Sequence, residues 1–152
     1  MLKLGKLADY ATVLMTALAA RPQDLRNAHE LAEHTHVPAP TVSKLLKLLS
    51  KAGLVESLRG ASGGYRLART PDAVTVADII RAVEGPIAIT QCSTHGEGCG
   101  IESTCGNRSN WRLIDGAIRH ALESVSLAQM ATPMARRMIE SPVKFITGAA
   151  RV

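Results

Sequence analysis

The chain has 152 residues with 18 Lys or Arg and 13 Asp or Glu, so one domain with an appendage and a core of moderate size are expected. Its formal net charge of +5 favours phosphate-bearing partners without requiring them. Three cysteines cannot all pair within the chain, and the composition differs from that of a secreted disulfide scaffold, so a reducing cytosolic compartment is expected.

The first 22 residues, MLKLGKLADYATVLMTALAARP, look like a secretory signal peptide in their early lysines, apolar run and small-residue ALAA. Asp9 argues against that interpretation, because it lies between the basic start and the apolar run. The apolar residues also recur at helical spacing, at Leu4, Leu7, Ala11, Leu14 and Leu18. We therefore predict a packed first helix. No run approaches the roughly 20 apolar residues of a membrane span, so no membrane partner is expected.

A helix-turn-helix is predicted from NAHELAEHTHVPAPTVSKLLKLLSKAGLVE. Asn27 and Glu30 have capping-box spacing for a short helix over 28–34. A second helix is expected to begin near Pro40 and to end at Gly53. Its apolar and basic residues lie on different faces, with Val42, Leu45, Leu46 and Leu49 on one and Lys44, Lys47 and Lys51 on the other. This pattern by itself also fits an ordinary amphipathic surface helix.

The next segment, LVESLRGASGGYRLAR, predicts two short strands around a glycine-rich tip without the spacing of a nucleotide-binding loop. Helix, turn, helix and basic hairpin is the order of a winged helix-turn-helix, whose second helix enters the major groove. Thr41, Ser43 and Lys44 are then the candidates for base-edge contacts. Arg59 is the candidate for a narrow minor groove. The candidates for phosphate contacts are Lys47, Ser62, Tyr65 and Arg66.

Two more helices are predicted further along the chain. TVADIIRAVEGP has Thr75 and Asp78 at capping-box spacing and Gly85 as a terminator. In SNWRLIDGAIRHALESVS, apolar residues recur every three or four positions, at Trp111, Ile114, Ile118, Ala121 and Val125. Such a stripe either packs within the subunit or pairs two helices of a dimer, and a dimer suits a palindromic operator. Residues 133–152 have no clear period and are expected to form a mobile tail.

All three cysteines, Cys92, Cys99 and Cys105, lie in the stretch CSTHGEGCGIESTC. Their spacing is unlike the paired ligands of zinc fingers and unlike a redox C-x-x-C pair. No motif supports a cysteine nucleophile with His95 or His120 as its base. Three thiolates on an irregular loop suit an iron-sulfur cluster with one ligand from elsewhere. A cluster-free thiol switch and a reduced structural set remain alternatives.

Together these segments resemble the IscR-like family of iron-sulfur winged-helix regulators. The resemblance rests on KLADYA, HELAEHTHVPAPTVSKLLKLLSKAGLVES, RGASGGYRLAR, VADIIRAVEGP and the three-cysteine loop before a long helix. Within the family the chain is most similar to the branch that controls the sulfur-mobilisation (SUF) assembly genes. The resemblance implies a homodimeric DNA-binding repressor or dual regulator, whose first and last helices build the dimer. It also implies that Cys92, Cys99 and Cys105 ligate a cluster.

The chain departs from the family at the fourth cluster ligand. Assembly-regulating members place a histidine three residues after the third cysteine, where this chain has Arg108. Nitric-oxide-sensing members use an aspartate near the start of the partner subunit, in a K-x-x-D context that KLAD reproduces with Asp9. Asp9 is therefore the first candidate and His95 the second, with Glu97 and Asn107 behind them. A local cap or ion pair of Asp9 is the alternative.

A second departure is His36, which lies in the turn between the two DNA-binding helices, where glycine is common in the family. Histidine adopts the left-handed backbone conformation more readily than most residues. The turn is therefore expected to form with some strain.

The predicted fold is mainly α: a winged helix-turn-helix with a two-stranded wing and a long C-terminal dimerisation helix. We expect a DNA-binding domain over 1–85, a cysteine-bearing loop over 86–108, the dimerisation helix over 109–132 and then the tail. The predicted protein is a cytoplasmic, homodimeric transcription regulator, with neither enzymatic activity nor a small-molecule substrate. An iron-sulfur cluster, 2Fe-2S in preference to 4Fe-4S, would control its binding to a palindromic operator near cluster-assembly genes. The alternatives are a cluster-free thiol-redox or nitric-oxide-responsive repressor, and a cluster carrier or cysteine enzyme.

Overall fold

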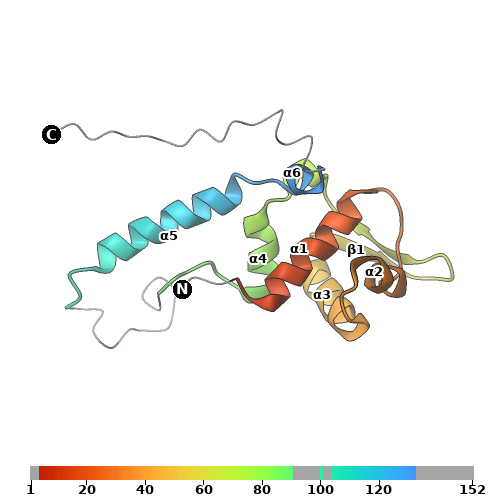
Figure 1. Ribbon diagram of the computed structural model, residues 1–152, viewed down its shortest axis with the longest axis horizontal. Coiled ribbons are helices and arrows are strands. Elements are labelled where there is room, and N and C mark those ends of the chain that lie inside the picture. Colours follow the sequence, from red (N-terminus) through yellow and green to blue (C-terminus); the bar gives the residue numbers. More distant parts are fainter. Residues whose placement is uncertain (1–3, 91–99, 101–103, 133–152) are drawn as a thin grey trace.

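The computed structural model describes residues 4–90, 100 and 104–132, so the expected tail lies outside the described residues. Figure 1 shows the resulting arrangement, in which α5 projects from a body formed by the other elements. The elements are α1 (Lys6–Ala19), α2 (Ala28–Thr35), α3 (Ala39–Lys51), β1 (Val55–Leu58), β2 (Gly64–Leu67), a short 3-10 helix (Pro71–Ala73), α4 (Val76–Glu84), α5 (Arg108–Glu123) and α6 (Leu127–Ala131). A mainly helical fold with a two-stranded antiparallel wing is confirmed. Within the described residues, no helix has the length and apolar character that a membrane crossing requires.

The ends of the helix-turn-helix follow from local hydrogen bonds. The N–H of Glu30 donates to Asn27 Oδ1 at 2.9 Å, and the N–H of Asn27 donates to Glu30 Oε2 at 3.1 Å, which completes the predicted capping box of α2. His36 closes α2 in the left-handed conformation, with φ of +57°. Gly53, with φ of +70°, follows the end of α3. The predicted helix boundaries are therefore right to within one or two residues.

One core holds the body together. Helix α1 lies against α2, α3, α4 and α6, and α3 contributes the four apolar residues of its predicted face. The largest fully buried side chains are Leu14, Met15, Leu18, Leu31, Leu45, Leu46, Leu49, Ile79, Leu127, Val42 and Val74. The predicted stripe of the first helix is confirmed from Leu7 onward, but Leu4 precedes α1 and is 47% exposed. Burial of this stripe fixes how the helix-turn-helix sits on α1.

A third short segment extends the wing. Strands β1 and β2 pair in antiparallel register from Val55 opposite Leu67 to Leu58 opposite Gly64. Arg26, just before α2, forms an antiparallel bridge with Tyr65 of β2, with backbone hydrogen bonds of 3.0 and 2.9 Å. A Cβ at Gly64 would lie 3.0 Å from backbone atoms of Arg26, so a side chain at this position would push the two segments apart.

The C-terminal part differs from the single helix expected over 109–132. Helix α5 ends at Glu123, and α6 begins a new turn in which Ser126 accepts a hydrogen bond from the N–H of Gln129 at 3.2 Å. The N–H of Leu127 donates to Val74 O at 2.8 Å, and the Leu127 side chain is fully buried in the core. The helix is interrupted here because α6 returns to the body, while α5 points away from it (Figure 1).

Candidate DNA-binding surface and cysteine segment

Helix α3 presents its predicted contact residues to solvent. Ser43, Lys44 and Lys47 are exposed, and Thr41 is half-buried in the first turn. The opposite face of α3 is fully buried, so the helix has one orientation on the body and one accessible face. Base-edge contacts by Thr41, Ser43 and Lys44 stay a prediction that this orientation permits.

The wing separates its predicted residues into three environments. Arg59 and Ser62 are exposed at the tip, between β1 and β2. Tyr65 is half-buried and packs against the core. Arg66 forms an ion pair with Glu56, the residue opposite it in the ladder. Of the predicted phosphate contacts in the wing, Arg66 is thus already balanced by an acid, whereas Ser62 is open to a partner.

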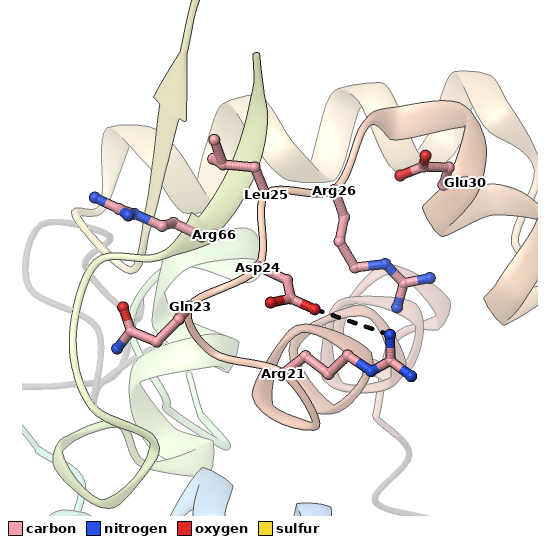
Figure 2. Close-up of a pocket in the computed structure, with 7 residues that line it drawn as sticks. All are labelled: Arg21, Gln23, Asp24, Leu25, Arg26, Glu30 and Arg66. Carbon is pink, nitrogen blue, oxygen red and sulfur yellow. Dashed lines mark ion pairs between the residues drawn. The ribbon is translucent and has the colours of Figure 1, made fainter. Parts of the chain in front are cut away.

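Arg26 is a basic residue beside the wing that the sequence analysis missed. It is half-buried and lines an open hollow of about 560 Å³. Figure 2 shows the residues that line this hollow: Arg21, Gln23, Asp24, Leu25, Arg26, Glu30 and Arg66. The signal for Arg26 in the sequence is its place directly before the Asn27 cap, although its pairing with Tyr65 is visible only in three dimensions.

The cysteine segment is described in part. Cys105 is half-buried, is not in a disulfide, and its carbonyl accepts a hydrogen bond from the N–H of Arg108 at 3.4 Å. Its thiol is therefore outside any disulfide and close to the start of α5, which leaves the sulfur available as a metal ligand. Cys92, Cys99, His95 and Glu97 lie outside the described residues.

The remaining ligand candidates do not form a site within the part of the chain that the structure describes. Asp9 is exposed on α1, and Asn107 is exposed directly before α5. In residues 4–90, 100 and 104–132, no three His, Cys, Asp or Glu side chains lie together as a metal site. The assignment of the fourth ligand stays a prediction.

Asp115 links α5 to the segment that leads into the cysteines. Its side chain is 3% exposed, and its Oδ1 accepts the N–H of Ile89 at 2.9 Å. Ile89 lies three residues before Cys92, and Asp115 lies on the helix that Cys105 precedes. A hydrogen bond to a buried carboxylate is stronger than one between neutral groups, so this contact fixes the path of residues 86–90 along α5.

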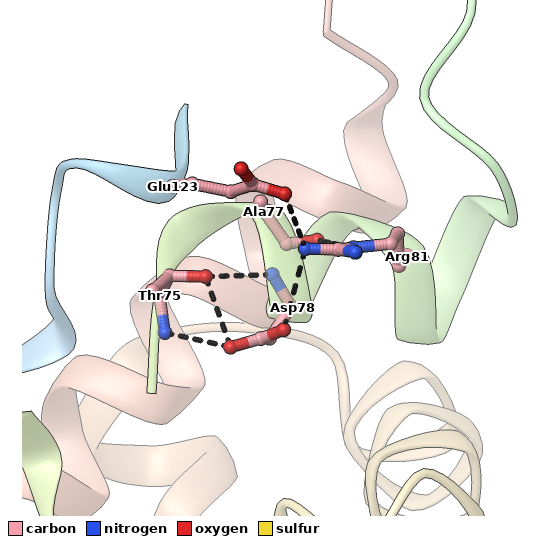
Figure 3. A network of polar contacts seen from close by, with 5 residues as sticks. All are labelled: Thr75, Ala77, Asp78, Arg81 and Glu123. Carbon is pink, nitrogen blue, oxygen red and sulfur yellow. Dashed lines mark hydrogen bonds and ion pairs between the residues drawn. The ribbon is translucent and has the colours of Figure 1, made fainter. Parts of the chain in front are cut away.

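The far end of α5 is attached to α4 through Arg81 (Figure 3). The Nη2 of Arg81 lies 3.1 Å from Glu123 Oε1 and 3.5 Å from Asp78 Oδ1. Asp78 in turn accepts the N–H and hydroxyl of Thr75 at 3.0 and 2.9 Å in the capping box of α4. Helix α5 is therefore attached to α4 at its C-terminal end by Glu123, and at its middle Asp115 holds the segment 86–90.

The predicted apolar stripe of α5 is buried at some positions and exposed at others. Trp111 and Ile118 are half-buried, and Ile118 lines a groove with residues of α4 and of the segment 86–89. Ile114 is 41% exposed, and Leu113, outside the predicted stripe, is 75% exposed. Val125, which follows the end of α5, is 38% exposed. We call Leu113, Ile114 and Val125 the outer stripe.

The sequence matches the family model described as Rrf2, iron-dependent transcriptional regulator, over residues 4–133. This range includes the winged helix, the cysteine segment, α5 and α6. The chain belongs to the Rrf2 family. It is therefore a DNA-binding transcriptional regulator and not an enzyme.

Relatives of this Rrf2 protein agree with that assignment. The regulator IscR of Aliivibrio salmonicida is 33% identical over 131 residues, which are 85% of this chain and 77% of that protein. The structure of CymR, the global cysteine regulator of B. subtilis, has a TM-score of 0.69 at 32% identity and covers 86% of this chain and 97% of that one. The structure of T. potens IscR has a TM-score of 0.68 at 30% identity, with 93% of each chain covered. The predicted resemblance to IscR-like regulators is thus confirmed.

Proposed function

We propose that this Rrf2 regulator binds a palindromic operator as a homodimer, in the cytoplasm, under the control of an iron-sulfur cluster held by Cys92, Cys99 and Cys105. The observation that carries the proposal is the unpaired, half-buried thiol of Cys105 at the start of α5. The relatives of this chain that are named IscR support an iron-sulfur cluster as the cofactor. The target genes that we propose are those for iron-sulfur cluster assembly, of the SUF type, and the cluster is 2Fe-2S.

On the DNA side, the exposed face of α3 enters the major groove. Thr41, Ser43 and Lys44 then reach base edges, and Lys47 reaches the phosphate backbone. At the wing, Arg59 enters the minor groove. Ser62, Tyr65 and Arg66 contact phosphates. Arg66 either leaves Glu56 for a phosphate or contacts Glu56 and the phosphate together.

On the cysteine side, the structure supports a connection from Cys105 to α5. Cys92, Cys99 and Cys105 would hold the cluster, with Asp9 of the partner subunit as the fourth ligand that we assign, and these residues would then be tied together. Cys105 acts on the first turn of α5, and Cys92 acts on the segment that Asp115 holds. Because Arg81 and Glu123 attach α5 to α4, a change in α5 alters the position of the winged helix relative to its dimer partner.

The test is an absorption spectrum of the anaerobically purified protein, with iron and sulfide counts and operator binding measured on the same sample. We expect a coloured protein with about two irons per protomer, and loss of both the colour and the operator selectivity in Cys105→Ala. Asp9→Ala should shift the visible bands and retain the iron at first. A colourless protein that binds DNA as its Cys92→Ala, Cys99→Ala, Cys105→Ala variant does would rule the proposal out.

A thiol-redox repressor is the second candidate, because Cys105 is a free thiol and the chain is similar in structure to CymR, the global cysteine regulator of B. subtilis. In that case, peroxide treatment of the iron-free protein should produce a disulfide or sulfenic acid, visible by mass spectrometry. Operator binding would then change with oxidation in the absence of iron.

A further inference from the structure

We propose that Arg26 is a contact to the DNA phosphate backbone, separate from α3 and from the wing tip. The inference rests on the proposed binding of duplex DNA and names an additional part of that surface. It starts from the hollow of Figure 2, where the Arg26 side chain lies near the N-terminus of α2.

The backbone position of Arg26 is fixed by the wing. Its N–H donates to Tyr65 O at 3.0 Å, and its carbonyl accepts the N–H of Tyr65 at 2.9 Å. Gly64 allows this close approach, because a Cβ there would lie 3.0 Å from Arg26. Neighbouring strands are about 4.8 Å apart, so Arg26 lies one strand spacing from the residues that follow the wing tip. A duplex that touches Ser62 therefore passes within reach of an arginine at this position.

Arg26 is also next to the helix-turn-helix. It directly precedes Asn27, which caps α2, and α2 packs against α3. The first helix of a helix-turn-helix crosses the DNA backbone when the second helix lies in the major groove. Arg26 thus lies between the wing, which the proposed function places on DNA, and the start of the helix that crosses the backbone.

The charges around Arg26 leave it available for a phosphate. Asp24 pairs with Arg21 at 3.9 Å, and Glu30 accepts the Asn27 N–H in the capping box. On the neighbouring strand, Arg66 pairs with Glu56. Among the described residues, no acid forms an ion pair with Arg26. Arg26 is half-buried and lines the hollow, and two N–H groups of its guanidinium can donate to one phosphate.

A phosphate contact of this kind adds affinity without sequence preference, because phosphates are the same at every base pair. It also releases counterions, so its loss lowers the salt dependence of binding by about 0.9 per contact in a plot of log K against log salt. A homodimer has two such contacts, which sets the expected change at about 1.8.

The experiment measures binding of the dimer to a fluorescent duplex of about 30 base pairs, long enough for two half-sites, at about 50 to 200 mM salt. Two duplexes are compared. One carries the sequence that the protein selects from a random library, and the other has a mixed sequence. In Arg26→Ala the slope should fall by about 1.8 on both duplexes, with the ratio of the two affinities unchanged. Arg26→Lys should keep the slope, since lysine retains the charge.

The matched controls are Arg119→Ala, exposed on α5, and Lys47→Ala on α3. The first should leave the slope unchanged and the second should lower it. If Lys47→Ala lowers the slope and Arg26→Ala does not, Arg26 has no role in DNA binding, although the proposed function stands. If the wild-type protein binds neither duplex, the proposed function itself is wrong, and the role of Arg26 with it. Circular dichroism of each variant verifies that it folds. Arg26→Ala is expected to fold, because the hydrogen bonds between Arg26 and Tyr65 are made by the backbone and not by the side chain.

Discussion

Two residues with positive φ close the helices of the helix-turn-helix, and they differ in whether they carry a side chain. His36 has φ of +57° and Gly53 has φ of +70°. A Cβ added at Gly53 would have Arg69 Nη2 as its nearest heavy atom, at 4.0 Å, so a methyl group there causes no clash. Substitutions at these two positions therefore report mainly on backbone strain.

We expect Gly53→Ala to lower the free energy of unfolding by about 1 kcal/mol, since alanine is strained at positive φ and only part of that cost is offset in the unfolded chain. His36→Gly should raise the free energy of unfolding by about 0.5 kcal/mol for the converse reason. Urea denaturation, with a comparison of midpoints at constant slope, measures both. Midpoints equal to the wild type in both variants would show that positive φ carries no cost in these turns.

At the scale of elements, the placement of α5 depends on two side chains of opposite kinds. Glu123 forms an exposed ion pair with Arg81, which stabilises little by itself. Asp115 is buried and accepts the amide of Ile89, so its loss leaves a backbone donor without its partner. The second contact therefore contributes more to the path of the segment that leads into the cysteines.

Asp115→Ala is expected to speed hydrogen exchange of the Ile89 amide by about 10- to 100-fold, the range for a hydrogen bond to a charged group. Asp115→Asn should keep most of the protection, because its side-chain oxygen still accepts. NMR-detected exchange resolves this single amide, with the Gly85 amide at the end of α4, bonded to Arg81 O at 3.2 Å, as an internal reference. An unchanged Ile89 rate in Asp115→Ala would mean that other contacts hold the segment.

At the scale of the whole molecule, the outer stripe of α5 is apolar surface on a helix that projects from the body. Leu113 and Ile114 of α5, and Val125 just after its end, are exposed in one protomer, while Ile118 and Leu122 of α5 line a groove with α4. A second copy of the same stripe is the simplest cover for it, because a two-fold axis brings identical surfaces together. The predicted homodimer would then use the helix that also carries the link to the cysteines.

Ile114→Glu should convert the dimer into a monomer, because a charge in a helix pair is buried without a partner. Sedimentation equilibrium measures the mass, and operator binding should weaken to that of a single half-site. Arg119→Glu, which places the same residue on α5 outside the outer stripe, is the control and should remain dimeric. A dimeric Ile114→Glu would place the interface elsewhere.

The sequence by itself determined the local features of this protein. Capping boxes at Asn27 and Thr75, the buried face of α3 and the strand pair of the wing depend on residues close together in the chain, whose spacing is readable. The family resemblance came from the order of these same segments.

Only the tertiary structure decided which side chains meet across the chain. It pairs Arg66 with Glu56, sets Arg26 beside Tyr65, and brings Asp115 to the amide of Ile89. It also ends α5 at Glu123 and returns α6 to the core, although the apolar period continues past that point. The physical reason is that periodicity gives the face of a helix, whereas the partner of that face depends on how the elements pack.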